Sequence, residues 1–381
     1  MFEKKKKDSG YISAKESRHI SRENRRITSK IEKRRNRKNV NPSEYMTQMR
    51  DPENVVEFDN LHTYFFTDIG TVKAVDGVSF DIPRGKTVGV VGESGCGKSV
   101  TSLSLMQLVQ RPQGQVVDGA IRFNSDEGVY DIAKTPTEVM QHIRGNQISM
   151  IFQEPMTSLN PVFRIGMQVD EVISLHNPSM IKDDVKKRTI EMLELVGIAN
   201  AQGVYAMYPH ELSGGMRQRV MIAMALALSP KLIIADEPTT ALDVTIQAQI
   251  LELMKRLQKE HGTSIILITH NMGIVAENCD DVAVMYMGRV VEYGTLEQIF
   301  TNPLHPYTQA LMRSVPVLGM DKSGELESIP GTTPDAATVF TGCEFANRCQ
   351  RATEACFHRF PKDTVYPDGH RVRCLHYEEG K

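Results

Sequence analysis

The sequence of 381 residues contains no apolar run approaching the roughly 20 residues that a helix needs to cross a bilayer. No segment is therefore predicted to span a membrane. The N-terminus also lacks the apolar stretch of a secretory signal, so the sequence indicates a cytosolic chain. Apolar residues make up 40% and charged residues 24% of the chain, and these proportions are ordinary for a soluble globular protein.

The chain also has little net charge, because the formal sum is −2, but the charge is unevenly distributed. Residues 1–40 hold 15 Lys and Arg against 5 Asp and Glu, a net of +10, which leaves −12 for the rest. Few apolar positions and no sustained periodicity occur there, so residues 1–50 are predicted to be a basic extension, disordered or loosely helical. Three roles stay open: a solvated tail without a ligand, contact with anionic lipid, or contact with nucleic acid.

A glycine-rich segment at residues 92–99 has the spacing of a phosphate-binding loop. An apolar run, 87–91, precedes it and a helix-compatible run, 99–108, follows it, which is the strand–loop–helix context that such a loop requires. Successive backbone N–H groups can then surround phosphate oxygens at the N-terminus of a helix. Lys98 is predicted to reach the outer phosphates and Ser99 to bind Mg²⁺. The predicted nucleotide contacts here are Gly92, Ser94, Gly95, Cys96, Gly97, Lys98, Ser99 and Val100.

Two further segments carry chemistry suited to a bound nucleotide. An apolar strand at 232–235 ends in Asp236 and Glu237. Asp236 is predicted to hold Mg²⁺, and Glu237 to polarise the water that attacks the γ-phosphate. Ser213 precedes two glycines and a helical run, so it is a good N-cap at a helix end that suits an anion. An acidic turn after a buried strand is the alternative for Asp236 and Glu237, and it is weakened by residues 238–243, which match a second motif. Taken alone, Ser213 is more often a plain cap than a phosphate site.

Together these segments resemble the ATP-binding-cassette ATPases over about residues 54–300. Residues 92–99 match the Walker A loop, 212–216 the signature, 233–237 the Walker B strand and 241–243 the D-loop. The resemblance implies that Gln153 is the Q-loop glutamine and His270 the switch histidine. Two positions depart from the usual pattern, Met216 in the signature and Asn271 after the histidine. The implied catalytic residues are Glu237, His270 and Gln153, the implied Mg²⁺ ligands Ser99, Gln153 and Asp236, and further nucleotide contacts Ser213, Gly214, Gly215 and Asp243.

The expected fold is α/β, a P-loop NTPase (RecA-like) core with an antiparallel β-subdomain and an inserted helical subdomain at about 155–228, all within residues 51–300. Alternation of apolar residues predicts strands at 55–65 and 75–82, and helices alternate with β-branched strands from 214 to 269. The family's adenine-stacking aromatic is expected at Phe65, with Tyr64 as the second choice. One Walker A loop and one signature predict a single nucleotide-binding domain.

Residues 301–381 are predicted to form a small cysteine-rich module. Cys343, Cys349, Cys356 and Cys374 lie within 32 residues, and four thiolates suit Zn²⁺ or an iron–sulfur cluster. Disulfides are not expected in a cytosolic chain. The gaps are wider than those of most structural zinc sites, so spacing alone leaves open either a metal site or scattered core thiols.

A second resemblance concerns this module. Residues 303–308 and 342–349 look like the C-terminal region of oligopeptide and dipeptide importer ATPases, and 216–225 is closer to the D-type than to the F-type subunit. The resemblance implies a [4Fe–4S] cluster on the four cysteines, with Zn²⁺ as the alternative. It also implies ATP and Mg²⁺ as cofactors.

The implied function is ATP hydrolysis that powers uptake of oligopeptides or dipeptides. The implied partners are an F-type ATP-binding subunit in a heterodimer, two transmembrane permeases and an extracellular or periplasmic peptide-binding protein, with this chain peripheral at the cytoplasmic face of the membrane. Nucleic acid is not an expected partner. Alternatives are an importer ATPase for nickel or another small solute, a non-transport cassette ATPase acting on nucleic acid or ribosomes, and a metal-binding regulator without hydrolysis. Intact Glu237 and His270 argue against the last.

Overall fold

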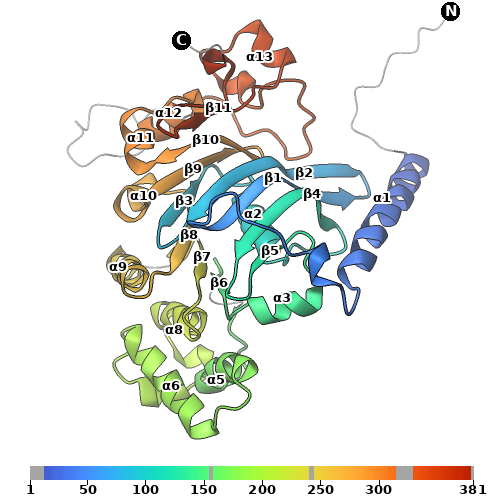
Figure 1. The fold of residues 1–381 in the computed structure, drawn as a ribbon. Coiled ribbons are helices and arrows are strands. Elements are labelled where there is room, and N and C mark those ends of the chain that lie inside the picture. Colours follow the sequence, from blue (N-terminus) through green and yellow to red (C-terminus); the bar gives the residue numbers. More distant parts are fainter. Residues whose placement is uncertain (1–12, 154–157, 240–243, 315–328, 379–381) are drawn as a thin grey trace, which may run out of the picture.

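A computed structural model describes residues 13–153, 158–239, 244–314 and 329–378. It contains two sheets, with a group of helices at one end and the C-terminal segment at the other (Figure 1). The smaller sheet is antiparallel in the order β2-β1-β4-β5 and corresponds to the predicted β-subdomain. Its strands are β1 (Asn54–Thr67), β2 (Gly70–Pro83), β4 (Gly114–Asn124) and β5 (Val129–Asp131).

The larger sheet has the order β11-β12-β10-β9-β3-β8-β7-β6. Strands β9, β3, β8, β7 and β6 are mutually parallel, and β10, β12 and β11 continue the sheet in antiparallel fashion. Every residue of β3, β7, β8 and β9 is buried, as expected for parallel strands covered on both faces. The bounds are β3 (Thr87–Val91), β6 (Ile148–Ile151), β7 (Leu232–Asp236), β8 (Ser264–Thr269), β9 (Asp281–Tyr286), β10 (Arg289–Thr295), β11 (Thr364–Val365) and β12 (Arg371–Val372).

The predicted alternation of helix and strand from residue 214 to 269 is confirmed. Strands β9 and β10 then form a hairpin around Gly288. Among the described helices, none is long and apolar enough to cross a bilayer. The α-helices are α1 (Ala14–Arg35), α2 (Lys98–Leu105), α3 (Thr137–Ile143), α5 (Ile165–His176), α6 (Lys182–Leu195), α7 (Ala201–Ala206), α8 (Gly214–Leu226), α9 (Val244–His261), α10 (Met272–Asn278), α11 (Leu296–Thr301), α12 (Pro306–Arg313) and α13 (Glu354–His358). Short 3₁₀ turns are η1 (Pro42–Glu44), η2 (Pro209–Glu211), η3 (Ala346–Arg348) and η4 (Leu375–Tyr377).

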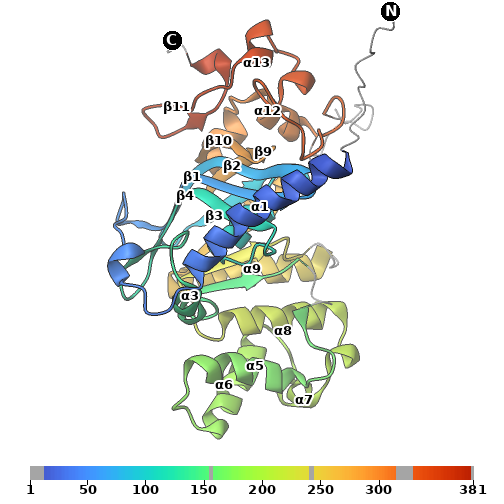
Figure 2. The same cartoon turned by 90° about the vertical axis from the view of Figure 1, so that its right-hand side faces the viewer.

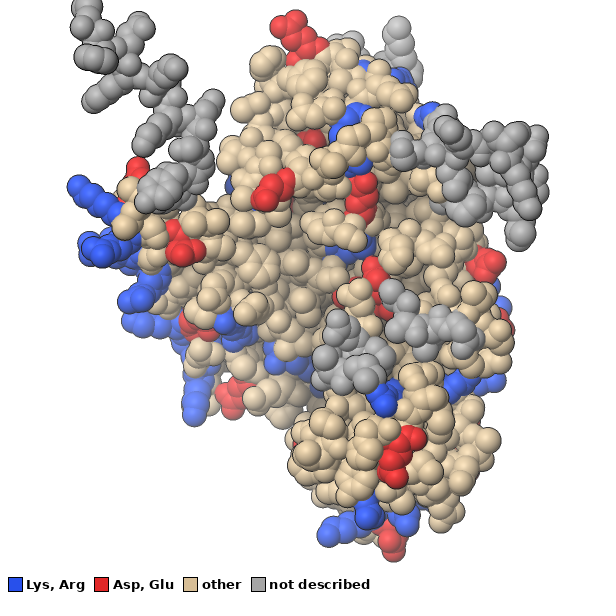
Figure 3. Space-filling model, turned by 180° about the vertical axis from the view of Figure 1, so that it is seen from behind, with Lys and Arg blue, Asp and Glu red and all other residues tan. Residues whose placement is uncertain are grey.

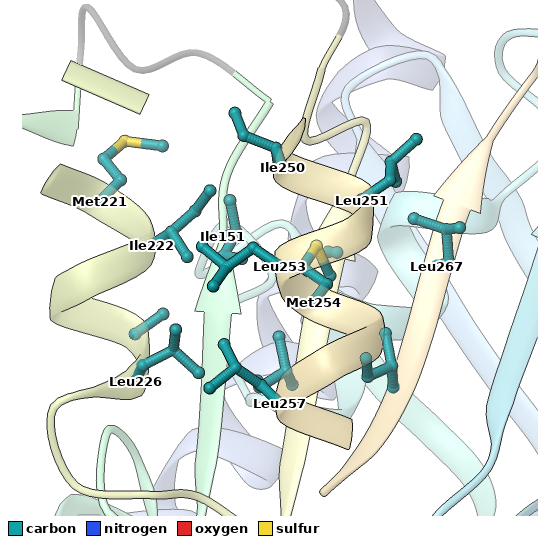
Figure 4. Close-up of a cluster of buried hydrophobic side chains, with 14 of the residues drawn as sticks. Ile151, Met221, Ile222, Leu226, Ile250, Leu251, Leu253, Met254, Leu257 and Leu267 are labelled. Carbon is teal, nitrogen blue, oxygen red and sulfur yellow. The ribbon is translucent and has the colours of Figure 1, made fainter. Parts of the chain in front are cut away.

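Helices α8 and α9 bury their apolar sides against the parallel strands (Figure 4). Ile222 and Leu226 of α8 and Leu253 and Leu257 of α9 belong to one buried cluster that also includes Ile151 of β6. Apolar residues three and four positions apart place these side chains on one face of each helix. Ser213 is the N-cap of α8, and β7 ends at Asp236. This cluster therefore fixes the distance between the signature residues and the Walker B strand.

The sequence predicts an N-terminal extension that is disordered or loosely helical. Where the structure describes it, residues 14–35 form the helix α1 (Figure 2). The helix lies along the antiparallel sheet, where Asn24 Nδ2 donates to the Thr67 carbonyl at 2.7 Å and Thr28 is buried. Polar side chains make this contact, so the apolar periodicity that signals a docked helix is absent.

The C-terminal segment is tied to the large sheet by Glu292 of β10, which is 1% exposed. Its carboxylate accepts hydrogen bonds from the backbone N–H groups of Leu304 at 2.7 Å and His305 at 2.9 Å, and lies 2.9 Å from His370 Nε2. His305 in turn caps α12, since its Nδ1 accepts from Tyr307 N at 3.0 Å. The strand, the helix and the final hairpin therefore meet at one buried carboxylate.

Burial lowers the pKa of His305 to about 4, although the nearby Glu292 acts in the opposite direction. The unfolded chain takes up this proton near the ordinary pKa of about 6.5, so between these values the unfolded state binds more protons and stability falls as the pH falls. The expected loss between pH 7 and pH 4 is about 3 kcal/mol. Urea unfolding at several pH values would measure it. The variant His305→Asn keeps a capping acceptor and should lose this part of the pH dependence; an unchanged pH profile in that variant would contradict the prediction.

Candidate functional site

The phosphate loop lies between β3 and α2, and the conformation of its backbone requires glycine. Gly97 is the N-cap of α2 with φ of 103°, and a Cβ there would lie 2.4 Å from the Ala74 carbonyl oxygen. Lys98 is 6% exposed, and its ammonium donates to the carbonyls of Gly92 at 2.7 Å and Glu93 at 3.0 Å. The loop thus holds a buried cation at the N-terminus of α2, which is the arrangement that attracts phosphate.

Two oxygen groups that suit Mg²⁺ meet at the edge of this loop. The Ser99 hydroxyl donates to the Asp236 carboxylate at 3.1 Å. Burial raises the pKa of Asp236, with the charge of Glu237 acting in the same direction, whereas the Ser99 hydrogen bond lowers it. A bound cation would offset both the burial of the Asp236 carboxylate and its repulsion by the charge of Glu237. Mg²⁺ commonly takes only one or two protein oxygens and completes its shell with phosphate and water, so these residues fit it.

Glu237 lies between the two other predicted catalytic residues. Gln153 Nε2 donates to one carboxylate oxygen at 2.9 Å, and His270 Nδ1 lies 3.1 Å from the other. Its backbone is left-handed, with φ of 46°, and its N–H donates to the Ile268 carbonyl of β8 at 3.0 Å. A non-glycine residue held in this region indicates a position fixed by its surroundings. The structure therefore brings Gln153, Glu237 and His270 together.

A cavity of about 360 Å³ opens between the loop and these residues. Gln153 and Glu237 line it, and so does Gly288 of the β9–β10 turn. Of the predicted phosphate contacts, Gly92 and Cys96 do not line it, and Cys96 is fully buried. The predicted contacts that do line it are Ser94, Gly95, Gly97, Lys98, Ser99 and Val100.

The other predicted nucleotide residues are placed elsewhere. Ser213 caps α8, where its Oγ accepts from Met216 N at 3.3 Å, but neither it nor Gly214 or Gly215 lines this cavity. Phe65 and Tyr64 do not line it either, and Tyr64 instead donates to Asp76 at 2.6 Å. Asp243 and the D-loop lie outside the described residues. These assignments remain predictions.

Asn271, which departs from the family pattern, caps α10. Its Oδ1 accepts from the backbone N–H groups of Gly273 at 2.9 Å and Ile274 at 3.4 Å. An aspartate carboxylate at this position would accept the same hydrogen bonds. The departure therefore leaves the helix start beside His270 intact.

No local sequence pattern predicts the contact between the C-terminal segment and the phosphate loop. Arg348 of η3 forms a bidentate ion pair with Glu93 of the loop, at 2.6 and 2.9 Å. Glu93 N donates to the Tyr307 hydroxyl at 2.9 Å, and Thr333 donates to the Glu93 carboxylate at 3.1 Å. The Arg348 side chain is only 5% exposed. We call Arg348, Tyr307, Thr333 and Glu93 the loop brace. Glu93 lies more than 200 residues from each of the other three members, which is why local patterns miss the brace.

The four predicted metal-binding cysteines lie near one another in the C-terminal segment. Burial raises the pKa of Cys343 to about 12, and the thiols of Cys374 and Cys356 add to the effect. Burial likewise raises the pKa of Cys374 to about 11, with Cys349 and Cys356 adding to it. Even so, among the described residues no group of three or more His, Cys, Asp or Glu side chains is arranged to hold a metal ion.

The fold and the site define the class of protein. A parallel sheet, a phosphate loop, and a glutamate between a glutamine and a histidine form an ATP-binding cassette. The family described as ABC transporter matches residues 75–240, and the family described as oligopeptide/dipeptide transporter, C-terminal region, matches residues 291–356. The chain belongs to the oligopeptide/dipeptide family of ABC transporter ATP-binding proteins.

Similarity to individual proteins extends over most of the chain. The oligopeptide transport ATP-binding protein AppD of Bacillus subtilis (strain 168) is 50% identical over 325 residues, which are 85% of this chain and 97% of the relative. The dipeptide transport ATP-binding protein DppD of the same organism is 49% identical over 322 residues, 84% of this chain and 94% of the relative. Among solved structures, the dimeric ABC transporter cassette MJ0796 is similar with a TM-score of 0.57 and 25% identity, covering 63% of this chain and 98% of the other.

Proposed function

We propose that this chain hydrolyses ATP to power the import of oligopeptides or dipeptides. The observation that carries the proposal is the Glu237 carboxylate, held by Gln153 and His270 at the mouth of a phosphate loop. The match extends over nearly the whole length of relatives that are named as oligopeptide and dipeptide transport proteins. The alternatives, import of nickel or another small solute and work on nucleic acid or ribosomes, have no such support.

The chemistry follows from the positions of these groups. Lys98 and the loop N–H groups bind the phosphates. Ser99 and Asp236 would hold Mg²⁺, which would neutralise charge on the phosphate oxygens. Glu237 accepts a proton from the attacking water and orients it towards the γ-phosphorus. Gln153 and His270 hold the two carboxylate oxygens of Glu237 in place. In the proposed mechanism both side chains respond to the presence of the γ-phosphate, and its loss changes their positions.

The N-terminus of α8 is proposed to contact the ATP that is bound by a second ATP-binding subunit. Ser213 and Gly214 are exposed at a helix end suited to an anion, yet they do not line the cavity of their own chain. In the proposed assembly ATP is bound between Lys98 of one subunit and the Ser213 equivalent of the other. The similar cassette MJ0796 is described as dimeric. An F-type subunit is the proposed partner, in a heterodimer.

An apolar groove beside Gln153 is the proposed contact for the permeases. The groove has a volume of about 270 Å³ and includes Leu108, Phe152 and Met224. Leu108 is 40% exposed and Phe152 is 41% exposed, and both line the same groove, where adjoining exposed apolar side chains suit a protein contact. Phe152 directly precedes Gln153, whose amide holds Glu237, so a movement of the groove is transmitted to the catalytic carboxylate. In the proposed assembly the chain lies at the cytoplasmic face of the membrane, with a peptide-binding protein on the opposite side.

The experiment is to purify the tagged chain from solubilised membranes and to identify its partners. Two permeases and a second ATP-binding subunit are expected, with ATP hydrolysis stimulated by peptide. Leu108→Asp should abolish permease recovery because a carboxylate cannot be buried in the groove, while ATP binding by the isolated chain persists. The control Val365→Asp changes an equally apolar exposed residue in β11 and should recover the permeases normally. Recovery of ribosomes or DNA without permeases would refute the function.

We also propose that Cys343, Cys349, Cys356 and Cys374 bind a [4Fe–4S] cluster, with Zn²⁺ as the alternative. Four cysteines that lie near one another supply the donor set, and a bound metal would stabilise the thiolate forms that burial otherwise disfavours. A cluster bound by these four cysteines would cross-link a segment that has little secondary structure.

The cluster is tested by measuring iron, acid-labile sulfide and zinc in protein purified without oxygen. Iron with sulfide and a visible absorption band are expected. Cys356→Ser should remove them, whereas Cys279→Ser, which changes a buried thiol between α10 and β9, should keep them. Zinc without sulfide would favour the alternative, and the absence of all three would refute both.

A further inference from the structure

Helix α1 begins through its own local chemistry rather than through the cassette. Ser13 and Glu16 form a capping box, in which Ser13 N donates to the Glu16 carboxylate at 2.9 Å and Glu16 N donates to Ser13 Oγ at 3.3 Å. Three basic residues, Lys33, Arg34 and Arg35, occupy the last turn, where they complement the helix dipole. The helix is therefore a defined element and not an incidental turn of the extension.

One face of α1 is fixed to the antiparallel sheet. Besides the Asn24 contact with β1, Gln115 of β4 donates to the Glu32 carboxylate at 2.7 Å, and Arg111 lies 3.7 Å from that carboxylate. Thr28 and Arg35 are buried on the same face. Because these positions recur every three or four residues, the opposite face is held outwards.

The outward face of α1 is strongly basic. Within the part of the chain that the structure describes, none of its eight exposed Lys and Arg side chains forms a salt bridge. Only Glu16 and Glu23 are exposed acids on the helix, and Glu16 is already bonded to Ser13. Figure 3 shows the resulting band of basic side chains along one edge of the molecule. We call it the α1 basic face: Lys15, Arg18, Arg22, Arg25, Arg26, Lys30, Lys33 and Arg34.

The C-terminal end of α1 lies beside the apolar groove of Leu108, Phe152 and Met224, which is the proposed contact for the permeases. Thr137 of α3 donates to the Asn36 side chain at 3.2 Å, directly after the helix. Arg35 lies in the electrostatic field of Arg111 and Arg144, and Arg144 lines the groove. Figure 2 shows the same relation, with α1 crossing the face of the molecule and ending next to α3. A surface next to a bound permease is also next to the lipid around it.

We propose that the α1 basic face binds anionic lipid headgroups of the membrane beside the permeases. The inference rests on the proposed function for the location of the membrane and on charge complementarity for the partner. Clusters of Lys and Arg at a membrane surface are attracted to anionic lipids, and each such residue strengthens binding several-fold. Nucleic acid presents phosphates too, but nothing in the proposed assembly places it at the groove.

The test uses the full chain and sedimented vesicles of phosphatidylcholine, with or without phosphatidylglycerol. Binding is expected only to the anionic vesicles and should weaken as salt is added. The quadruple variant Arg18→Gln, Arg22→Gln, Arg26→Gln and Lys33→Gln should lose more than about tenfold in binding. The matched control removes four exposed charges elsewhere, Lys182, Lys187, Lys259 and Lys362, each replaced by Gln, and should bind as the unaltered chain does.

ATP hydrolysis in solution separates failure of this inference from failure of the proposed function. Both quadruple variants should hydrolyse ATP normally and unfold at the unaltered temperature, since none of the changed residues lines the nucleotide cavity. Equal vesicle binding by the two variants would overturn the role of α1 and leave the ATPase untouched. Tight binding of a random RNA, together with no preference for anionic vesicles, would overturn lipid as the partner.

Discussion

Replacing Glu237 with Gln is expected to slow ATP turnover by at least about 100-fold while ATP binding is retained. The amide has nearly the same shape and can stay between Gln153 and His270, but it cannot accept a proton from water. With hydrolysis blocked, ATP remains bound between two subunits, so the closed pair should accumulate. Single-turnover kinetics, nucleotide affinity and the mass of the assembly in solution would measure the three effects.

Glu260→Gln is the matched control because it removes one exposed carboxylate from α9. Its turnover should equal that of the unaltered chain. Unchanged hydrolysis in Glu237→Gln would remove Glu237 from its assigned role. Loss of ATP binding in that variant would show instead that the carboxylate supports the shape of the site, since Gln153 and His270 both contact it.

Removing the Arg348 side chain should destabilise the protein and weaken ATP binding. In Arg348→Ala the Glu93 carboxylate loses both bidentate bonds, and breaking a largely buried ion pair from one side costs up to roughly 3 kcal/mol. Glu93 lies inside the phosphate loop, so the loop is then held by Tyr307 and Thr333 alone. We expect KM for ATP to rise with little change in kcat, because the catalytic contacts of Glu237 are separate. Urea unfolding and steady-state kinetics would measure the two effects.

A double substitution isolates the pair itself. Arg348→Met combined with Glu93→Gln leaves no uncompensated charge, so its effect should be smaller than the sum of the two single substitutions. Arg348→Lys keeps the positive charge but loses the bidentate geometry of the guanidinium group. Its stability and its KM should lie between those of the unaltered chain and those of Arg348→Ala. Arg351→Ala, an exposed arginine of the same segment, is the control and should be neutral. Normal stability and normal KM in Arg348→Ala would remove the brace from any role in the nucleotide site.

The parts of the fold that sequence predicts are those fixed by local chemistry. The buried strands β3, β7 and β8 appear as apolar runs, and Ser213 is recognisable as a cap, because both signals lie within a few residues. The sequence also places Lys98 in the loop and helix that follow one apolar strand, β3, and Asp236 and Glu237 at the end of another, β7. Since parallel strands end at one edge of a sheet, these residues meet there.

The parts that sequence misses depend on distant or polar contacts. The docking of α1 uses Asn24 and Thr28, so no apolar stripe announces it. Strands β11 and β12 have two residues each, too few for a periodic signal. The pair of Glu93 and Arg348 joins residues 255 apart, and either side chain alone looks like an ordinary surface charge.

Glu292 has a consequence for how the protein melts. Glu292 lies on β10, which pairs with β9 of the large sheet, whereas the groups around its carboxylate, Leu304 N, His305 N and His370, all belong to the segment that follows this sheet. Unfolding of that segment would leave the Glu292 carboxylate without these partners in an apolar interior. The large sheet and the C-terminal segment are therefore expected to unfold as one cooperative unit. Heating should therefore give them a single shared calorimetric transition.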